Sequence, residues 1–212
     1  MEYEEFRSKV ENYPFFGDWV FDVLVSNTKS FRNRVSEWVA KGYLLRLKNG
    51  LYTLREKDRK VKFTLAYLAN HLYSPSYISL EYALQHYNFI PEAVHLITSV
   101  TSKKTKNITN DLGSFSYSKI KSEMFSNYSL TKDYYGNEFY IASPEKALID
   151  FLYFRVRKIK KLKKNIFESS YRLQNLEEVD CKKLMRISSA FKMKKLDSIT
   201  KLLIEYIKEE WK

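Results

Sequence analysis

The stretch NTKSFRNRVSEWVAKGYLLRLKNGLYTL, residues 27–54, decides the fold of the first part of this chain. Its apolar side chains recur at the i, i+4, i+7 and i+8 spacing of one helix face, at Phe31, Val35, Trp38 and Val39. Asn27 or Thr28 can cap the start of that helix, and Gly42 stands where a glycine commonly ends one. The spacing therefore predicts an amphipathic helix over about residues 28–41.

A short basic hairpin is predicted directly after this helix. Residues 44–48 and 51–54 flank the pair Asn49-Gly50, which tolerates the positive φ angles of a type I′ turn. Alternation along the first strand predicts one basic and one buried face, with Arg46 and Lys48 on the former and Leu45 and Leu47 on the latter. A helix, a glycine and a basic hairpin in this order are typical of a winged helix-turn-helix, which binds DNA.

The outward face of the predicted helix carries groups suited to DNA. Asn33 is at its centre, where an amide can pair with N6 and N7 of adenine. Arg32 and Arg34 flank it and are placed for phosphates, or for guanine if the helix tilts. The hairpin is expected to follow the backbone or the minor groove. A solvated polar face is the alternative interpretation. The candidate DNA-binding residues are Thr28, Lys29, Ser30, Arg32, Asn33, Arg34, Ser36, Arg46, Lys48 and Asn49.

The composition bounds the classes of function. The 212 residues are 44% hydrophobic and 16% aromatic, which excludes general disorder. A net charge of +12 favours an anionic partner. Cys181 is the single cysteine, and the three histidines lack the spacing of metal ligands, so we expect no disulfide, no bound metal and no cofactor. We find no signal peptide and no apolar run of the roughly 20 residues that span a bilayer, so we expect a soluble cytoplasmic protein without a membrane partner.

The predicted elements fall into two domains. Helices over about residues 2–12 and 19–25 precede the stretch described above, and a charged segment without apolar period follows it. We therefore expect a winged helix-turn-helix domain at residues 1–58 and a second domain at residues 59–212. The second domain alternates helices and strands before a helical end, so the predicted class is α+β. Its expected elements are helices at 63–72, 80–87, 144–158, 180–191 and 196–210, and strands at 94–100, 114–119 and within 134–142.

Basic residues of the second domain suggest a further anion site. Residues 155–164 read RVRKIKKLKK, and the pair Lys103-Lys104 follows a predicted strand. The lysine pair is suited to an acidic partner or a nucleotide, and the basic run to phosphate or RNA. Cations at a helix C-terminus are also explained by the helix dipole. Ser143 begins the SPEK motif and is explained as an N-cap, so we expect no catalytic residue. The candidate residues of this second basic site are Lys103, Lys104, Arg155, Arg157 and Lys158.

Several ordered motifs resemble one known family. They are SPSYISLEYALQHYNFIPEA (residues 74–93), ITSVTSKKT (97–105), LGSFSYSKIK (112–121) and IASPEKALIDFLY (141–153), together with GYLLRLKNGLYTL (42–54) of the predicted hairpin. These motifs are similar to those of the AbiEi family, the antitoxins of type IV abortive-infection toxin–antitoxin systems. The resemblance spans most of the chain. The N-terminal helix and the basic run at 155–164 are not part of it.

The resemblance implies a DNA-binding autorepressor without enzymatic activity. Such a protein binds inverted repeats in its own promoter, as a dimer or a cooperative pair, and counteracts a nucleotidyltransferase-like toxin without necessarily forming a stable complex with it. Two other functions stay open: direct binding of the toxin, and transcriptional regulation without a toxin partner. An enzyme that reverses the toxin's modification would need a polar constellation that the sequence does not show.

Overall fold

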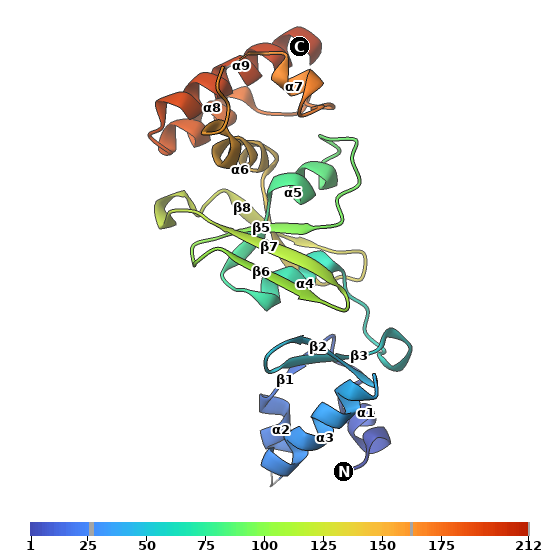
Figure 1. Ribbon diagram of the computed structural model, residues 1–212. Coiled ribbons are helices and arrows are strands. Elements are labelled where there is room, and N and C mark those ends of the chain that lie inside the picture. Colours follow the sequence, from blue (N-terminus) through green and yellow to red (C-terminus); the bar gives the residue numbers. More distant parts are fainter. Residues whose placement is uncertain (26–27, 162, 212) are drawn as a thin grey trace.

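The computed structural model describes residues 1–25, 28–161 and 163–211, and the backbone alone at Thr28. It mixes helices with two β-sheets, which confirms the predicted α+β class. The elements form an N-terminal part (residues 1–58) and a C-terminal part (residues 59–212), which follow one another along the length of the molecule in Figure 1. The expected caps Asn27 and Thr28 lie outside the described residues and side chains.

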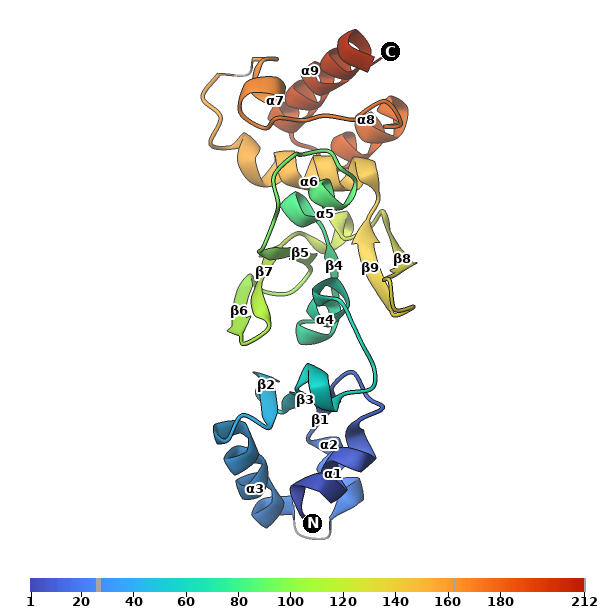
Figure 2. The ribbon, with the colours of Figure 1, turned by 90° about the vertical axis from the view of Figure 1, so that its right-hand side faces the viewer.

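The N-terminal part places its helices on one side of a small sheet. Its elements are α1 (Tyr3–Val10), β1 (Phe16–Gly17), α2 (Trp19–Leu24), α3 (Thr28–Ala40), β2 (Leu44–Lys48) and β3 (Leu51–Leu54), and the strand order is β1-β3-β2. The sheet lies between these helices and the C-terminal part (Figure 2). Aromatic rings fill the core: the ring of Phe6 stacks 5.1 Å from that of Trp38 and meets Phe31 at 5.5 Å. The predicted apolar face of α3 is therefore the buried one.

Helix α3 ends just before Gly42, the glycine at which the sequence predicts its end. Gly42 has a φ of +70°. Its N–H donates to the carbonyl of Val39 at 2.9 Å, and the N–H of Tyr43 donates to that of Trp38 at 2.8 Å. These two bonds are those of a Schellman motif, which satisfies carbonyls that the last turn of a helix leaves free. The chain reverses here and enters β2.

The hairpin differs from its prediction in turn type and in alternation. Only Gly50 has a positive φ, +70°, so the turn at Asn49-Gly50 is not type I′. The pairing of β2 with β3 shifts register between Arg46 and Lys48. Because of this bulge, the buried residues of β2 are Leu44 and Leu47, and the prediction of a buried face with Leu45 and Leu47 was wrong. Leu44 joins the N-terminal core, whereas Leu47 belongs to the larger core of the C-terminal part.

The C-terminal part is a six-stranded mixed sheet between helical layers. Its strands are β4 (Ser76–Ile78), β5 (Ile97–Thr101), β6 (Lys106–Asn110), β7 (Gly113–Lys119), β8 (Tyr128–Lys132) and β9 (Glu138–Ala142), in the order β6-β7-β5-β4-β9-β8. The pairs β5–β7 and β4–β9 are parallel, and the others are antiparallel. The helices are α4 (Leu65–Leu72), α5 (Leu80–His86), α6 (Pro144–Val156), α7 (Ile166–Ser169), α8 (Cys181–Ala190) and α9 (Lys194–Trp211), with the 3₁₀ turn η2 (Ser122–Met124). The 3₁₀ turn η1 (Glu56–Asp58) ends the N-terminal part.

Helices cover both faces of the six-stranded sheet. Helix α4 covers the face of the sheet toward the N-terminal part, α5 and α6 cover the opposite face, and α7 to α9 form an outer layer (Figure 1). Thr64 caps α4 by accepting from the N–H of Tyr67. Ser79 precedes α5, but its hydroxyl donates to Asp150 and makes no cap. The loop that enters β4 contains a cis peptide bond before Pro75.

The two parts contact each other through the β2–β3 hairpin. The side-chain amide of Asn110, at the end of β6, donates to the carbonyl of Leu47 at 3.0 Å. Leu51 packs partly buried against the core of the C-terminal part. The connecting segment is also held, because the N–H of Lys60 donates to the carbonyl of Glu11 at 2.8 Å. The hairpin is thus shared between the two cores.

Candidate nucleic-acid interface

Helix α3 presents a polar stripe opposite its buried face. Lys29, Asn33 and Ser36 are all exposed, and Phe31 and Val35 on the other side are buried. The helix lies on the far side of the N-terminal sheet from the C-terminal part (Figure 2). Asn33 therefore occupies the middle of an accessible helix face, with a cation one turn before it. Ser30 and Glu37 border this stripe and are also exposed.

The flanking arginines are engaged within the N-terminal part. Arg32 lies 3.8 Å from a carboxylate oxygen of Asp18, with both side chains well exposed. Arg34 donates to the carbonyl of Met1 at 2.6 Å and to the carboxylate of Glu2 at 3.0 Å. Arg32 can exchange a weak, exposed ion pair for a phosphate. Arg34 is held by the first residues of the chain, so it is the weaker candidate for a DNA contact.

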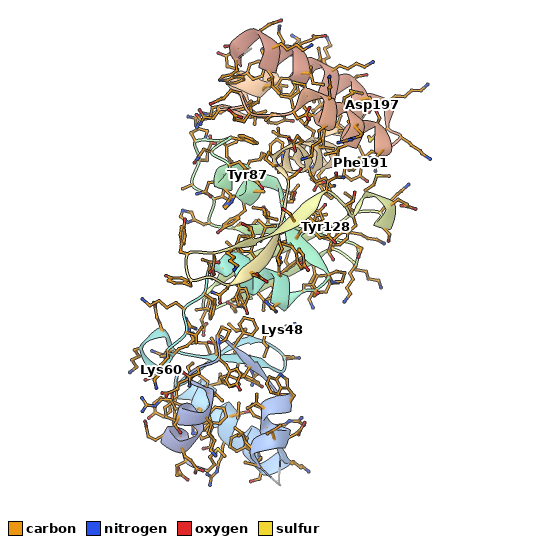
Figure 3. All side chains as sticks on the ribbon, turned by 180° about the vertical axis from the view of Figure 1, so that it is seen from behind. Lys48, Lys60, Tyr87, Tyr128, Phe191 and Asp197 are labelled. Carbon is orange, nitrogen blue, oxygen red and sulfur yellow. The ribbon has the colours of Figure 1, made fainter. Side chains whose placement is uncertain are left out.

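The hairpin divides its three candidates between solvent and the C-terminal part. Arg46 is exposed, with its guanidinium carbon 5.7 Å from the ring centre of Tyr52, and Asn49 is exposed at the turn. The Lys48 ammonium instead donates to the carbonyls of Leu72, at 2.7 Å, and His71, at 3.2 Å. These carbonyls end α4, where the helix dipole favours a cation. The structure thus places Lys48 at the boundary between the two parts, away from the exposed face of α3 (Figure 3).

The second predicted basic site is not one site in the structure. Lys103 donates to the carbonyl of Ser74 near the end of α4, and Lys104 beside it is exposed. Arg155 lies across the sheet, ion-paired with Glu81 of α5. Its guanidinium also covers the ring of Phe151 at 3.7 Å. Arg157 and Lys158 are exposed just beyond α6. The structure therefore separates the lysine pair from the three residues around the end of α6.

The SPEK motif serves structure through a buried ion pair that the sequence analysis missed. Ser143 accepts from the N–H of Lys146 at 3.3 Å, which confirms it as the N-cap of α6. Lys146 and Asp150 are both fully buried and form an ion pair one turn apart. Asp150 also accepts from the hydroxyls of Tyr77 and Ser79, each at 2.9 Å. Burial raises the pKa of Asp150, whereas Lys146 and the two hydroxyls lower it. The i, i+4 spacing of a lysine and an aspartate in an apolar helix was the available signal.

A second buried carboxylate ties α6 to α8. Glu145 is 5% exposed, and the Lys183 ammonium lies 2.7 Å from its oxygen. The Ser143 hydroxyl donates to the same oxygen at 2.9 Å. Burial opposes ionisation, but the hydrogen bonds from Lys183 and Ser143 outweigh it and hold the pKa of Glu145 below its ordinary value. The carboxylate of Glu145 and the ammonium of Lys183 thus form an ion pair that joins α6 to α8.

Within the described ranges, no three His, Cys, Asp or Glu side chains gather as metal ligands would. None of the described helices has the length and apolar character that crossing a bilayer requires. The sequence matches no protein-family model, and a search among curated proteins also returned no match.

Proposed function

We propose that the N-terminal part binds double-stranded DNA as a winged helix-turn-helix. The observation that carries the proposal is the exposed stripe of α3, with Asn33 at its centre and an aromatic core behind it. The order α1-β1-α2-α3-β2-β3 supports it, because a reading helix followed by a hairpin is the expected layout. Asn33 and Lys29 are assigned to the bases, and Arg32, Arg46 and Asn49 to the backbone.

The proposal extends to the biological role that the resemblance implies. The chain is an autorepressor and a type IV antitoxin of the AbiEi kind, which binds an inverted-repeat operator and counteracts a nucleotidyltransferase-like toxin. The motifs at residues 74–93 and 141–153 support this assignment, since they lie in the C-terminal part and outside the proposed DNA-binding face. Neutralisation of the toxin is accordingly assigned to the C-terminal part.

Binding of the full chain to its own upstream DNA tests the first assignment. Asn33→Ala is expected to weaken binding to that DNA by about 1–3 kcal/mol and to leave binding to unrelated DNA nearly unchanged, because a base contact carries the sequence preference. Arg46→Ala is expected to weaken both and to lower the salt slope by about 0.9, the loss of one phosphate contact. Fluorescence anisotropy over a range of salt concentrations measures these effects.

Lys201→Ala is the matched control, because Lys201 is an exposed lysine of α9 in the C-terminal part. Unchanged affinity and salt slope in both test variants would show that α3 and the hairpin do not contact DNA.

Co-expression with a neighbouring nucleotidyltransferase-like gene tests the antitoxin role. A double Asn33→Ala/Arg46→Ala variant is expected to lose repression and still to restore growth. Loss of both would contradict the division between the two parts.

A second candidate function is direct contact with a protein partner. The β8–β9 hairpin exposes several large apolar side chains: Leu130 (47%), Tyr134 (98%), Tyr135 (53%) and Tyr140 (45%). Large exposed apolar side chains on one hairpin favour a protein-binding surface. Co-purification with the toxin at high salt would favour this function, because an apolar interface survives salt whereas a phosphate contact weakens.

A further inference from the structure

A cavity of about 400 Å³ opens in the C-terminal part, between the end of α4, the loop that enters β4 and the β8–β9 pair. Two of its polar lining residues are at least nine-tenths buried: Asn70 is 8% exposed and Ser76 is 5% exposed. The proposed DNA-binding face does not include this cavity. Its volume suits a small molecule.

Both buried groups have hydrogen-bonding capacity left over. The Asn70 carbonyl oxygen accepts from the N–H of Tyr140 at 2.6 Å, which fixes the orientation of the amide. The amide nitrogen of Asn70 and the hydroxyl of Ser76 have no hydrogen-bond partner within the described part of the chain. A buried polar group without a partner destabilises the fold, because it has lost its hydrogen bonds to water. Both atoms are closed to water in this structure, so a polar ligand reaches them only when the cavity wall adjusts.

Aromatic rings form much of the remaining cavity wall, which also includes Pro75 and Glu138. Tyr128 is partly buried, stacks on Tyr77 at 4.7 Å and meets Tyr140 edge-on at 5.5 Å. Phe125 lies 5.1 Å from Tyr128 between ring centres. Figure 3 shows Tyr128 in the middle layer of the molecule. Rings held in place by their neighbours provide π-faces on which a flat heterocycle can stack. The wall thus favours a planar ligand.

Three lysines gather at the same end of α4. Lys103 donates to the carbonyl of Ser74 at 2.5 Å, and Lys48 donates to that of His71 at 3.2 Å; both Ser74 and His71 line the cavity. Lys106 lies 5.2 Å from the ring centre of Tyr73. Burial lowers the pKa of Lys48, and the charges of Lys106 and Lys103 lower it further. None of them is ion-paired with a carboxylate among the residues that the structure describes. Such a cluster attracts an anion.

We propose that this cavity binds a nucleotide. The base lies against Tyr128 and Tyr140 and accepts hydrogen bonds from the amide of Asn70 and the hydroxyl of Ser76. The phosphate lies at the end of α4, near Lys103 and Lys106. The aromatic wall accounts for a base and the unpaired lysines for a phosphate, and a nucleoside phosphate is the ligand class that satisfies both.

Isothermal titration calorimetry on the full chain tests the proposal. The probes are the monophosphates of adenosine, guanosine, cytidine and uridine, the four nucleosides and inorganic phosphate. At least one nucleotide is expected to bind at least tenfold more tightly than its nucleoside and than phosphate, because the two subsites act together. Absence of binding by every nucleotide at millimolar concentration would overturn the proposal. Equal affinity for phosphate and nucleotides would also overturn it, since the cavity would then hold no base.

Variants separate the two subsites. Ser76→Ala is expected to weaken nucleotide and nucleoside binding at least fivefold while the melting temperature stays equal or rises, because the variant removes an unpartnered buried hydroxyl. Lys103→Gln/Lys106→Gln is expected to weaken the nucleotide at least tenfold and to leave the nucleoside unchanged. Lys201→Gln, remote on α9, is the control for net charge. Wild-type affinity in both test variants would contradict the site.

Discussion

At the scale of single residues, the least expected feature is the Lys146–Asp150 pair. Both side chains are fully buried, and Tyr77 and Ser79 complete the ligation of the carboxylate. Taking two charges out of water is costly, and only close partners offset that cost. The pair therefore links α6 to β4 and to the start of α5, and its two members depend on each other.

This dependence predicts strong coupling between the two positions. Asp150→Ala is expected to lower the free energy of unfolding by about 3–5 kcal/mol, because it leaves the Lys146 ammonium buried without its partner. Adding Lys146→Met to that variant is expected to recover part of the loss, since the uncompensated charge disappears. Urea unfolding of the two single variants and the double variant measures the coupling. Additive losses would show that the charges do not interact.

At the scale of elements, the end of α3 depends on one glycine. Gly42 has a φ of +70°, and the Arg55 guanidinium occupies the place that a Cβ would take. Gly42→Ala is expected to lower the free energy of unfolding by about 1–2 kcal/mol because of the left-handed backbone, and by a smaller further amount because the flexible end of Arg55 has to move aside. Thermal unfolding measures the loss.

Gly136→Ala is the matched control for this prediction. Gly136 also has a positive φ, +86°, but a Cβ there meets nothing within 4 Å. The loss at Gly42 is expected to exceed that at Gly136, and Arg55→Ala is expected to reduce the difference. Equal losses at the two glycines would exclude a contribution from the clash.

Local signals predicted the helices well and the strands less well. The apolar period of α3, the serine cap of α6 and the terminal glycine of α3 are properties of adjacent residues, so the sequence is sufficient for them. Strands β6 and β8 are sheet edges with polar and exposed side chains, and β4 has only three residues. None of the three shows a clear apolar alternation. They form because neighbouring strands supply their hydrogen bonds.

The candidate DNA-binding site was predictable only where it depends on neighbouring residues. The exposed position of Asn33 follows from the period of its own helix. The engagements of Arg34 with Met1 and of Lys48 with α4 depend on segments 33 and 24 residues away. Leu47 broke the predicted alternation for the same reason, because it packs in the core of the other part. Contacts between distant segments are not encoded in a local pattern.

At the scale of the whole molecule, Lys48 joins the two parts at the end of α4. Lys48→Met is expected to lower the free energy of unfolding by about 1 kcal/mol, through loss of the hydrogen bonds to the carbonyls of His71 and Leu72. It is expected to leave the salt slope of DNA binding unchanged, in contrast to Arg46→Ala. Urea unfolding and anisotropy titrations measure the two effects, with Lys121→Met as an exposed control. A lowered salt slope in Lys48→Met would show that this lysine contacts DNA.

The anchored hairpin has a consequence for the geometry of binding. Asn110 holds the carbonyl of Leu47, Lys48 holds the end of α4, and the same hairpin follows α3 directly. These contacts fix the direction of α3 relative to the C-terminal part. If two copies bind an inverted repeat as proposed, this fixed direction limits how many base pairs can separate the two half-sites.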